Sequence, residues 1–406
     1  MSRGATGPAG SHPSRRLPEI KGLRGLIAVS VVLHHSLIVL PAVYDSPQNH
    51  GLTTLNVLKY SPLGVFLPGP ETVLFFFLIS GFVLALPFVD GRAPGFFRFV
   101  VKRVARIWPA YAVACVLAFA TAGVVGGSAN PSLSGWLGDA WRTPVTAKAV
   151  FQHLTLVTDF PSGGFNPVFW SLIHEMRVSL VFPFLAVLVL WQRRWWLALA
   201  ASIAVAYTAM ELMPPRHGNS SWLLTAAYMQ FFVSGILLAR HRSAVIDRVR
   251  AASTLSRLAL AAASLLLYTH PWWMPRVGHS QAPFFDLECV LAGTIGLLVA
   301  TIGSPRAAAV LCTRPLQYLG RISYSLYLVH AIVLLALLHL FYGRMPLAVL
   351  LIALWPLSLG LATLGERYVE QPSIALGRRL TQRKPKRSRA RDGVATVLPS
   401  PVGESL

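Results

Sequence analysis

Charged residues are scarce in this sequence. They make up 13% of the chain, whereas soluble domains usually carry about 25%. Only 15 residues are acidic, against 36 lysines and arginines, so the formal net charge is +21. This composition disfavours a soluble globular domain and favours a protein that is surrounded by lipid.

Cysteine is also rare. The sequence has three cysteines, Cys115, Cys289 and Cys312, and all of them lie in or beside long apolar runs. Their number and spacing predict neither a disulfide framework nor a cysteine metal site. The chemistry predicted below needs no metal.

Long hydrophobic runs, in contrast, are abundant, and 54% of the residues are hydrophobic. A helix of about 20 apolar residues crosses a hydrocarbon core of roughly 30 Å. Because backbone groups in lipid must hydrogen-bond within their own segment, each run predicts a helix. We therefore expect an all-α integral membrane protein, a bundle of about ten transmembrane helices. The expected spans are residues 23–42, 71–89, 105–126, 170–191, 195–212, 222–240, 254–270, 285–303, 322–342 and 346–367.

The chain divides into three parts. Residues 1–18 are rich in Gly, Pro, Ser and Ala and predict a disordered segment. Residues 19–376 form the expected membrane domain. Residues 377–406 predict a basic, disordered cytoplasmic tail that contacts anionic lipid head groups.

The basic residues follow the topology. If the N-terminus lies inside, most lysines and arginines fall in the inner segments, as the positive-inside rule requires. The positive charge therefore indicates orientation, and we expect no nucleic-acid partner. The prediction is a multi-pass protein of the inner (plasma) membrane with both termini cytoplasmic.

Arg24 and His35 stand out on the first span. They are eleven positions apart, which returns to nearly the same helix face after a rise of about 16 Å. This spacing is comparable to an extended pantetheine arm, while His34 is expected to point elsewhere. A membrane histidine usually faces a cavity or the bundle interior, and imidazole suits a general base toward a hydroxyl. The alternative for His35 is a packed, hydrogen-bonded histidine.

A second group of ionisable residues lies on the fourth span. Glu175 is expected at a depth at which it meets His35, and it shares a helix face with Ser171. Trp170 and Ser171 are candidate substrate contacts. Arg177 is either functional or a structural counter-ion to Glu175 or Glu71, and the role of His174 stays open.

A basic segment, Asp90 to Trp108, is expected as an inner loop. Its arginines Arg98, Arg103 and Arg106 suit bidentate phosphate contacts. The alternative is that these charges only set the topology. In the outer loop 127–169, Trp136 and Trp141 suit either sugar stacking or the membrane interface.

Further candidates lie near the C-terminus. His330, in the ninth span, is either catalytic or a hydrogen-bonded histidine that holds neighbouring helices. Tyr327 precedes it by one turn, and both residues are candidate substrate contacts. Glu366 and Glu370 share a face of the last helix and are expected to pair with arginines.

Six short motifs occur in order across residues 19–372. They are Gly22-Leu23-Arg24-Gly25-Leu26 with His35, Phe76-Phe77-Leu78-Ile79-Ser80-Gly81-Phe82, Arg103-Val104-Ala105-Arg106-Ile107-Trp108-Pro109 with Tyr111, Asn166-Pro167 with Trp170-Ser171-Leu172 and Glu175, Ile322 to His330, and Glu370-Gln371-Pro372. With these motifs the sequence resembles acyltransferase family 3, the membrane O-acyltransferases of bacterial surface polysaccharides and some secondary metabolites. Two departures are Lys21, where members often have Asp, and Met176-Arg177-Val178-Ser179, which replaces an aromatic end.

The resemblance implies that Arg24 and His35 are essential, that Glu175 is functional and that cytoplasmic arginines engage an acyl-CoA donor. We expect an acyl, most simply an acetyl, group to pass to a hydroxyl of a carbohydrate or cell-surface acceptor with His35 as general base. Direct transfer and a covalent relay both remain open. The alternative from another class is a transporter or flippase with an intramembrane His, Glu and Arg path.

Overall fold

The chain is described here in a computed structural model. The described residues are 17–44, 64, 69–127, 132–137, 140–142, 144–214, 218–273 and 283–382. Most of the two segments expected to be disordered, 1–18 and 377–406, lies outside these ranges, as does most of residues 43–70, which join the first two expected spans.

Helices account for the architecture, and the described ranges contain no β-strand. The long helices are α1 (Pro18–Ile38), α4 (Pro70–Val89), α5 (Phe96–Val125), α7 (Phe169–Trp191), α8 (Trp195–Glu211), α9 (Trp222–Arg240), α11 (Thr254–Tyr268), α13 (Pro283–Gly303), α15 (Arg314–Phe341) and α16 (Leu347–Gly365). The short ones are α2 (Pro41–Tyr44), α6 (Ala147–Thr155), α10 (Arg242–Ala251), α12 (His270–Trp273), α14 (Pro305–Leu311) and α17 (Gln371–Leu380), with 3₁₀ turns at Gly135–Leu137 and Ser162–Gly164. The all-α bundle is confirmed.

Seven helices among the described residues are long and apolar enough to cross a membrane: α4, α5, α7, α9, α13, α15 and the continuous run α16–α17. Two shorter apolar helices, α8 and α11, coincide with expected spans. The remaining expected span is α1, whose first turns carry Lys21 and Arg24. Each of the ten expected spans thus corresponds to a helix, and the chain is a multi-pass membrane protein.

Two helices begin earlier than the hydrophobic pattern indicated. α5 starts at Phe96, so the expected loop from Asp90 to Trp108 is wrong for most of its length, and only Asp90 to Gly95 connect α4 to α5. α15 starts at Arg314, within the segment expected to precede the span. The physical reason is that lysine and arginine are good helix formers, so a basic stretch ends the apolar run without ending the helix.

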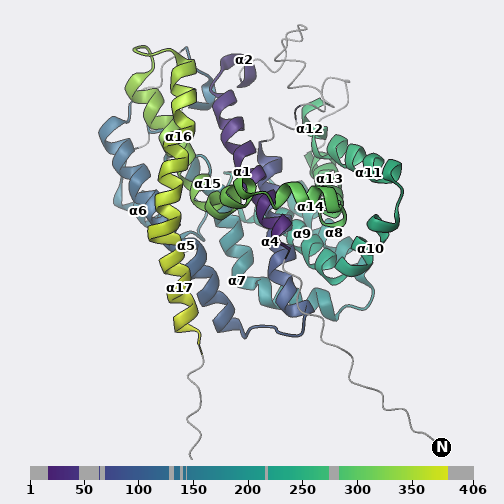
Figure 1. Cartoon of the computed structure of the whole chain (residues 1–406). Coiled ribbons are helices and arrows are strands. Elements are labelled where there is room, and N and C mark those ends of the chain that lie inside the picture. Colours follow the sequence, from purple (N-terminus) through teal and green to yellow (C-terminus); the bar gives the residue numbers. More distant parts are fainter. Residues whose placement is uncertain are drawn as a thin grey trace, which may run out of the picture.

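The last helix also continues further than expected. After α16 the chain forms a π-helical turn, Glu366–Glu370, and runs on into α17 as far as Leu380. Figure 1 shows α16 and α17 as one long column at the edge of the bundle. A π turn widens the helix locally, and this one carries both Glu366 and Glu370.

Glycines bring two helix pairs into close contact. A Cβ atom at Gly25 of α1 would collide with the backbone of Gly320 in α15. Likewise a Cβ at Gly81 of α4 would collide with the carbonyl of Phe232, and one at Gly235 of α9 with the carbonyl of Leu78. Small residues allow such close backbone approach between membrane helices. They fix α1 against α15 and α4 against α9.

The two ends of the bundle differ. The α4–α5 connection and the end of α17 lie at the lower end in Figure 1, where Arg98 donates to the carbonyl oxygen of Thr381 at 2.6 and 2.9 Å. α2, α12 and the α15–α16 turn lie at the upper end.

At the lower end Asp90 binds Arg242 at 2.6 Å and Arg92 at 2.9 Å. The hydrogen bond from Arg242 holds the pKa of the Asp90 carboxyl below its ordinary value.

Candidate active site

Three cavities follow one another from the lower end of the bundle toward the upper end. The first, here called the basic groove, lies between the start of α5 and the end of α17. Four cations line it together with Leu380 to Gln382: Arg92, Arg98, Lys102 and Arg103. Its volume is about 790 Å³. The groove has room for a large polyanion and the charge to attract one.

The second, the arginine cavity, is enclosed by α1, α4, α5, α7 and α15. Its ionisable lining residues are Arg24, Arg103, Arg106 and Glu175, and Tyr324 and Tyr327 add hydroxyl groups. Its volume is about 100 Å³, much less than that of the groove. A space of this size admits a thin chain better than a bulky group.

Two of the three arginines in this cavity have carboxylate partners. Arg103 donates to Glu175 Oε1 at 2.7 Å and to the hydroxyl of Ser179. Arg106 pairs with Glu370 at 2.7 Å. Arg24 makes no hydrogen bond or ion pair with any described residue. Three guanidinium groups against two carboxylates leave one unpaired positive charge, carried by Arg24.

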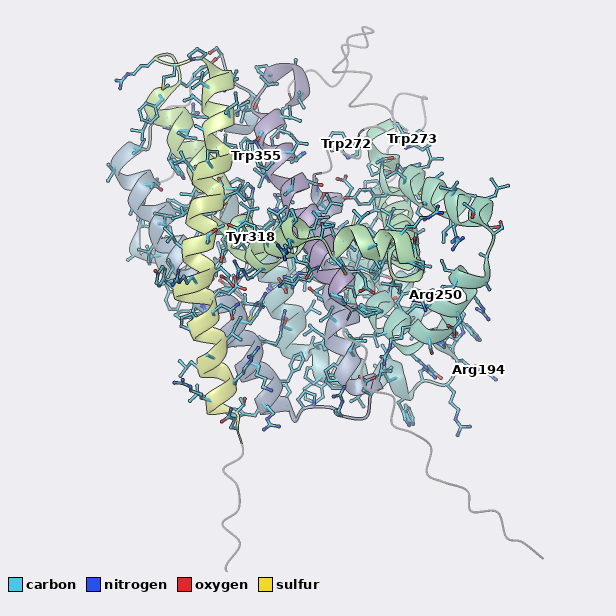
Figure 2. The ribbon with its side chains drawn as sticks, viewed as in Figure 1. Arg194, Arg250, Trp272, Trp273, Tyr318 and Trp355 are labelled. Carbon is cyan, nitrogen blue, oxygen red and sulfur yellow. The ribbon has the colours of Figure 1, made fainter. Side chains whose placement is uncertain are left out.

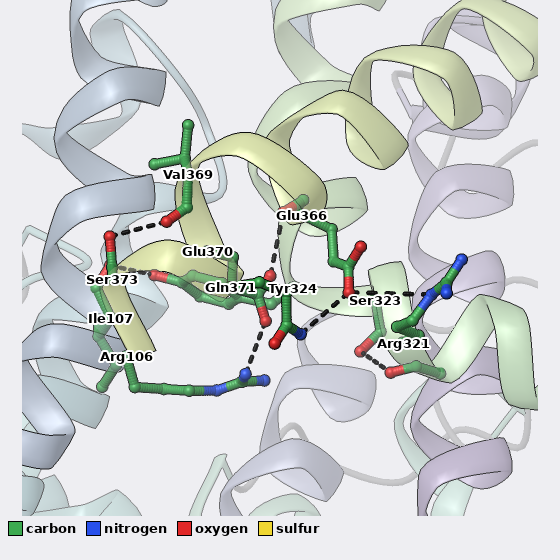
Figure 3. A network of polar contacts seen from close by, with 12 residues as sticks. Arg106, Ile107, Arg321, Ser323, Tyr324, Glu366, Val369, Glu370, Gln371 and Ser373 are labelled. Atoms are coloured by element: carbon green, nitrogen blue, oxygen red, sulfur yellow. Dashed lines mark hydrogen bonds and ion pairs between the residues drawn. The ribbon is translucent and has the colours of Figure 1, made fainter. Parts of the chain in front are cut away.

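The pairing of Arg106 with Glu370 links α5 to the π turn. The Glu370 side chain is fully buried, and its second oxygen accepts from Ser325 of α15 at 3.1 Å. Figure 3 shows the Arg106–Glu370 pair beside the more open pair of Arg321 and Glu366, whose nitrogen and oxygen atoms are 3.8 Å apart. Both glutamates therefore pair with arginines, as the sequence predicted.

The third, the histidine cavity, lies between α1 and the segments near the upper end. Its volume is about 510 Å³. The ring-bearing residues on its wall are His34, His35, Tyr44, Trp136, Trp170, Trp272 and Tyr327, and Asn219 adds an amide. Trp272, from α12, lies at the upper end in Figure 2. None of the described residues on this wall carries a formal charge, so the cavity suits a neutral ring system.

His35, on the wall of this cavity, forms a pair of imidazoles with His330, which is fully buried and is not among the lining residues. His330 Nε2 is 3.2 Å from His35 Nδ1. In addition, His35 Nδ1 is 3.0 Å from the carbonyl oxygen of Val31, and His330 Nδ1 is 3.0 Å from the carbonyl oxygen of Leu326. Since a carbonyl only accepts, both Nδ1 atoms carry hydrogen. His330 Nε2 then accepts from His35, and His35 Nε2 keeps a free lone pair and makes no hydrogen bond with the described residues.

The three cavities are joined by residues that they share. Val83, Leu84 and Arg103 line both the basic groove and the arginine cavity. Val73 and Tyr327 line both the arginine cavity and the histidine cavity. Arg24 and His35 thus lie on successive cavities along α1, in agreement with their expected common face.

Several sequence predictions on geometry were wrong. Glu175 does not meet His35, because it lies on the arginine cavity and binds Arg103, whereas His330 is the partner of His35. Depth along a helix does not fix the direction in which a side chain points. His34 does not point away, since it lines the histidine cavity with His35.

Arg177 is not a counter-ion to Glu175 or Glu71. Its guanidinium donates to the carbonyls of Val157, Thr158 and Ser220 at 2.7 to 2.9 Å and lies 3.7 Å above the Trp222 ring. Backbone carbonyls of two neighbouring loops replace the carboxylate. His174 bonds Thr225 and the Asn219 carbonyl, both at 2.8 Å. Both residues therefore hold these loops in place.

The remaining candidates divide between the arginine cavity and the histidine cavity, which together are called the inner cavities. Ser171 lines the arginine cavity and binds the Tyr327 hydroxyl at 2.7 Å, while Trp170 lines the histidine cavity. Of the loop tryptophans, Trp136 packs 5.3 Å from the His35 ring, and Trp141 instead donates to the Phe165 carbonyl. Sequence reasoning gave no role to Ser179, Trp272 or Tyr324, although Tyr324 lies within the motif that ends at His330 and Ser179 within the departure beside Glu175.

Fold and site together define an integral membrane protein in which a cavity that carries a histidine adjoins a cavity lined by arginines. The family model described as "Acyltransferase domain" matches residues 17–365. The chain therefore belongs to acyltransferase family 3, the family that the sequence motifs indicated. No curated protein and no solved structure matches the chain. Family membership makes the protein a membrane acyltransferase.

The Arg106–Glu370 pair leads to a prediction on stability. In Arg106→Gln the fully buried Glu370 carboxylate loses its cation, and we expect a loss of about 1–3 kcal/mol. The readout is the melting temperature of the purified protein in detergent. Arg321→Gln is the matched control, because Arg321 is half-exposed and its pair with Glu366 is worth roughly 1 kcal/mol or less. Equal melting temperatures for the two variants would contradict the prediction.

Proposed function

We propose that this acyltransferase moves an acyl group, most simply acetyl, from acyl-CoA to a hydroxyl of a carbohydrate or cell-surface acceptor, with His35 as general base. One observation carries the proposal: a basic groove, a narrow arginine cavity and a histidine cavity are joined in series by shared residues. The donor end of this path is strongly cationic. The acceptor end is aromatic and, among its described residues, uncharged.

The basic groove fits the nucleotide end of CoA. CoA carries a pyrophosphate and a ribose phosphate, and arginine forms the best bidentate contacts with phosphate oxygens. Arg98 and Arg103 line the groove, and Arg103 and Arg106 line the next cavity, so the three arginines singled out in the sequence cover successive parts of the path. Among the described residues Arg103 and Arg106 have carboxylate partners, which leaves Arg24 as the unpaired cation of the arginine cavity.

The distance along the path fits the pantetheine arm. From Arg24 to His35 the α1 backbone rises about 16 Å. A thin arm passes through a cavity of about 100 Å³ where the nucleotide does not. The nucleotide therefore stays in the groove while the thioester approaches the Tyr327 side of the histidine cavity.

The histidine pair supplies the base. The acceptor hydroxyl gives its proton to His35 Nε2, and its oxygen bonds to the thioester carbon. The carbon–sulfur bond then breaks, and the proton passes to the departing CoA thiolate. While His35 is protonated, its Nδ1–H donates to His330 Nε2, which stabilises the cation and fixes the ring. His330, and not Glu175, is therefore the residue that orients the His35 ring.

The proposed orientation follows from the charges. The basic groove faces the cytoplasm, where acyl-CoA is made, and both termini lie on that side of the inner (plasma) membrane. The histidine cavity opens toward the outer face, where a cell-surface acceptor is found. Anionic lipid head groups meet the remaining arginines at the cytoplasmic surface.

The proposal is tested with the purified full chain in liposomes. With labelled acetyl-CoA and N-acetylglucosamine as hydroxyl probe, we expect release of CoA thiol and a labelled O-acetyl sugar. We also expect acetyl-CoA to raise the melting temperature, because a ligand that binds only the folded state stabilises it. Absence of both thiol release and stabilisation would overturn the proposal, and sugar movement across the liposome without thioester cleavage would favour a transporter.

The same preparation separates direct transfer from a covalent relay. A relay forms an acyl-enzyme, so labelled CoA would exchange into acetyl-CoA without any acceptor. Direct transfer, which we propose, gives no exchange.

A further inference from the structure

Tyr327 occupies the place where the arginine cavity ends and the histidine cavity begins. With Val73 it is one of the two described residues that line both cavities. Both side chains are buried, at 7% and 6% exposure. The tyrosine therefore separates the proposed donor space from the proposed acceptor space.

The Tyr327 hydroxyl is tied to α7. It lies 2.7 Å from Ser171 Oγ and 3.2 Å from the carbonyl oxygen of Val168, and Ser171 also donates to that carbonyl at 3.1 Å. The two hydroxyls have one hydrogen each for these three contacts, so one hydroxyl donates to the Val168 carbonyl and the other donates to the oxygen of the first. Such an arrangement holds the ring in place but costs little to break, since a neutral hydrogen bond contributes about 0.5–1.5 kcal/mol.

The Tyr327 ring borders open space in two directions, because it lines both cavities. Phe76, which lines the arginine cavity, has its ring centre 6.3 Å from that of Tyr327, and the ring centre of His330 is 6.0 Å away. The helices themselves do not provide the opening, because α1 and α15 are in backbone contact at Gly25 and Gly320. Rotation of one side chain is the smallest change that connects the two cavities.

We propose that Tyr327 is a movable partition, held closed by Ser171, that keeps the thioester away from His35 and from water until an acceptor fills the histidine cavity. This inference rests on the proposed function. Tyr327 is then a specificity-determining residue, because its position decides whether the acyl group passes to the acceptor or to water. Exclusion of water from reactive intermediates is a general task of such closures.

The side reaction that the partition prevents is hydrolysis. Water in the histidine cavity gives a proton to His35 Nε2, and its oxygen bonds to the thioester carbon. The carbon–sulfur bond breaks, the CoA thiolate takes up a proton, and the free carboxylic acid is released. No other reactant is needed, so the reaction is measured as CoA thiol released from acetyl-CoA without acceptor.

The experiment compares the ratio of hydrolysis to transfer in four variants of the full chain. Tyr327→Phe and Ser171→Ala each remove one hydroxyl of the tie, and we expect the ratio to rise about 2- to 10-fold. Tyr327→Ala removes the partition itself and should raise the ratio further. The control is Tyr318→Phe, on the same helix, whose hydroxyl bonds Thr363 at 2.6 Å away from all three cavities; its position is labelled in Figure 2.

The outcomes separate this inference from the proposed function. If the wild type neither cleaves acetyl-CoA nor acetylates the sugar, the proposed function fails. If the wild type transfers the acetyl group and the ratio in Tyr327→Phe and Ser171→Ala equals that of Tyr318→Phe, the partition is wrong. Should Tyr327→Ala not yield a monodisperse protein, the two hydroxyl variants decide the question alone.

Discussion

Replacement of His35 by alanine is expected to lower the rate of acyl transfer about 10²- to 10⁴-fold, the usual contribution of a general base. The reason is that His35 lines the histidine cavity and its Nε2 makes no hydrogen bond with the described residues, so this nitrogen can accept the proton. Donor binding should be preserved, because the basic groove and Arg24 are unchanged. The measurement is the rate of O-acetyl sugar formation, together with the stabilisation by acetyl-CoA.

His339→Ala is the matched control for this prediction. His339 lies on α15 and bonds the carbonyl four residues before it at 2.9 Å, as His35 and His330 do, but it lines neither inner cavity. We expect its transfer rate to stay near that of the wild type. Equal rates for His35→Ala and the wild type would remove the base from the mechanism, while loss of acetyl-CoA binding would indicate a folding defect.

Removal of the Arg24 charge is expected to have the second-largest effect. In Arg24→Ala the arginine cavity loses its one cation without a carboxylate partner among the described residues. A hydrogen bond to a charged group contributes about 1.5–3 kcal/mol, which corresponds to a roughly 10- to 100-fold fall in kcat/KM for acetyl-CoA. Arg24→Lys should recover part of this loss, because lysine keeps the charge but not the bidentate geometry.

The comparison of two donors shows where Arg24 acts. Acetyl-pantetheine lacks the nucleotide but keeps the thioester and the arm. If Arg24 acts on the arm or the acyl group, as its place between the groove and His35 indicates, Arg24→Ala should impair both donors to the same degree. A defect that is confined to acetyl-CoA would instead place Arg24 at the phosphates. Arg250→Gln is a suitable control, because this exposed arginine of α10 lines none of the three cavities.

Much of the fold was predictable because each transmembrane helix is a local feature. Ten apolar runs gave ten helices, since a backbone in lipid has no other way to satisfy its hydrogen bonds. The ends of the helices were less predictable. The basic start of α5 contains no helix breaker between Phe96 and Trp108, so hydropathy alone placed its beginning too late.

The site was predictable where it depends on one helix and not where it depends on two. The eleven-residue spacing of Arg24 and His35 places them on successive cavities. The pairing of His35 with His330 joins residues 295 positions apart, and no periodicity along one helix reveals which helices are neighbours. For the same reason Glu175 was assigned to the wrong partner, although its depth was compatible with either.

The glycine contact between α1 and α15 has a consequence for the histidine pair. Gly25 precedes His35 by ten positions, and Gly320 precedes His330 by the same number. Two helices that touch at the glycines and again at the imidazoles run side by side in one direction, with the same rise of about 15 Å on each. Gly25 and Gly320, which have no side chains, thus set the alignment of the two imidazole rings from about 15 Å away along each helix. A methyl group added at either glycine would shift one ring relative to the other.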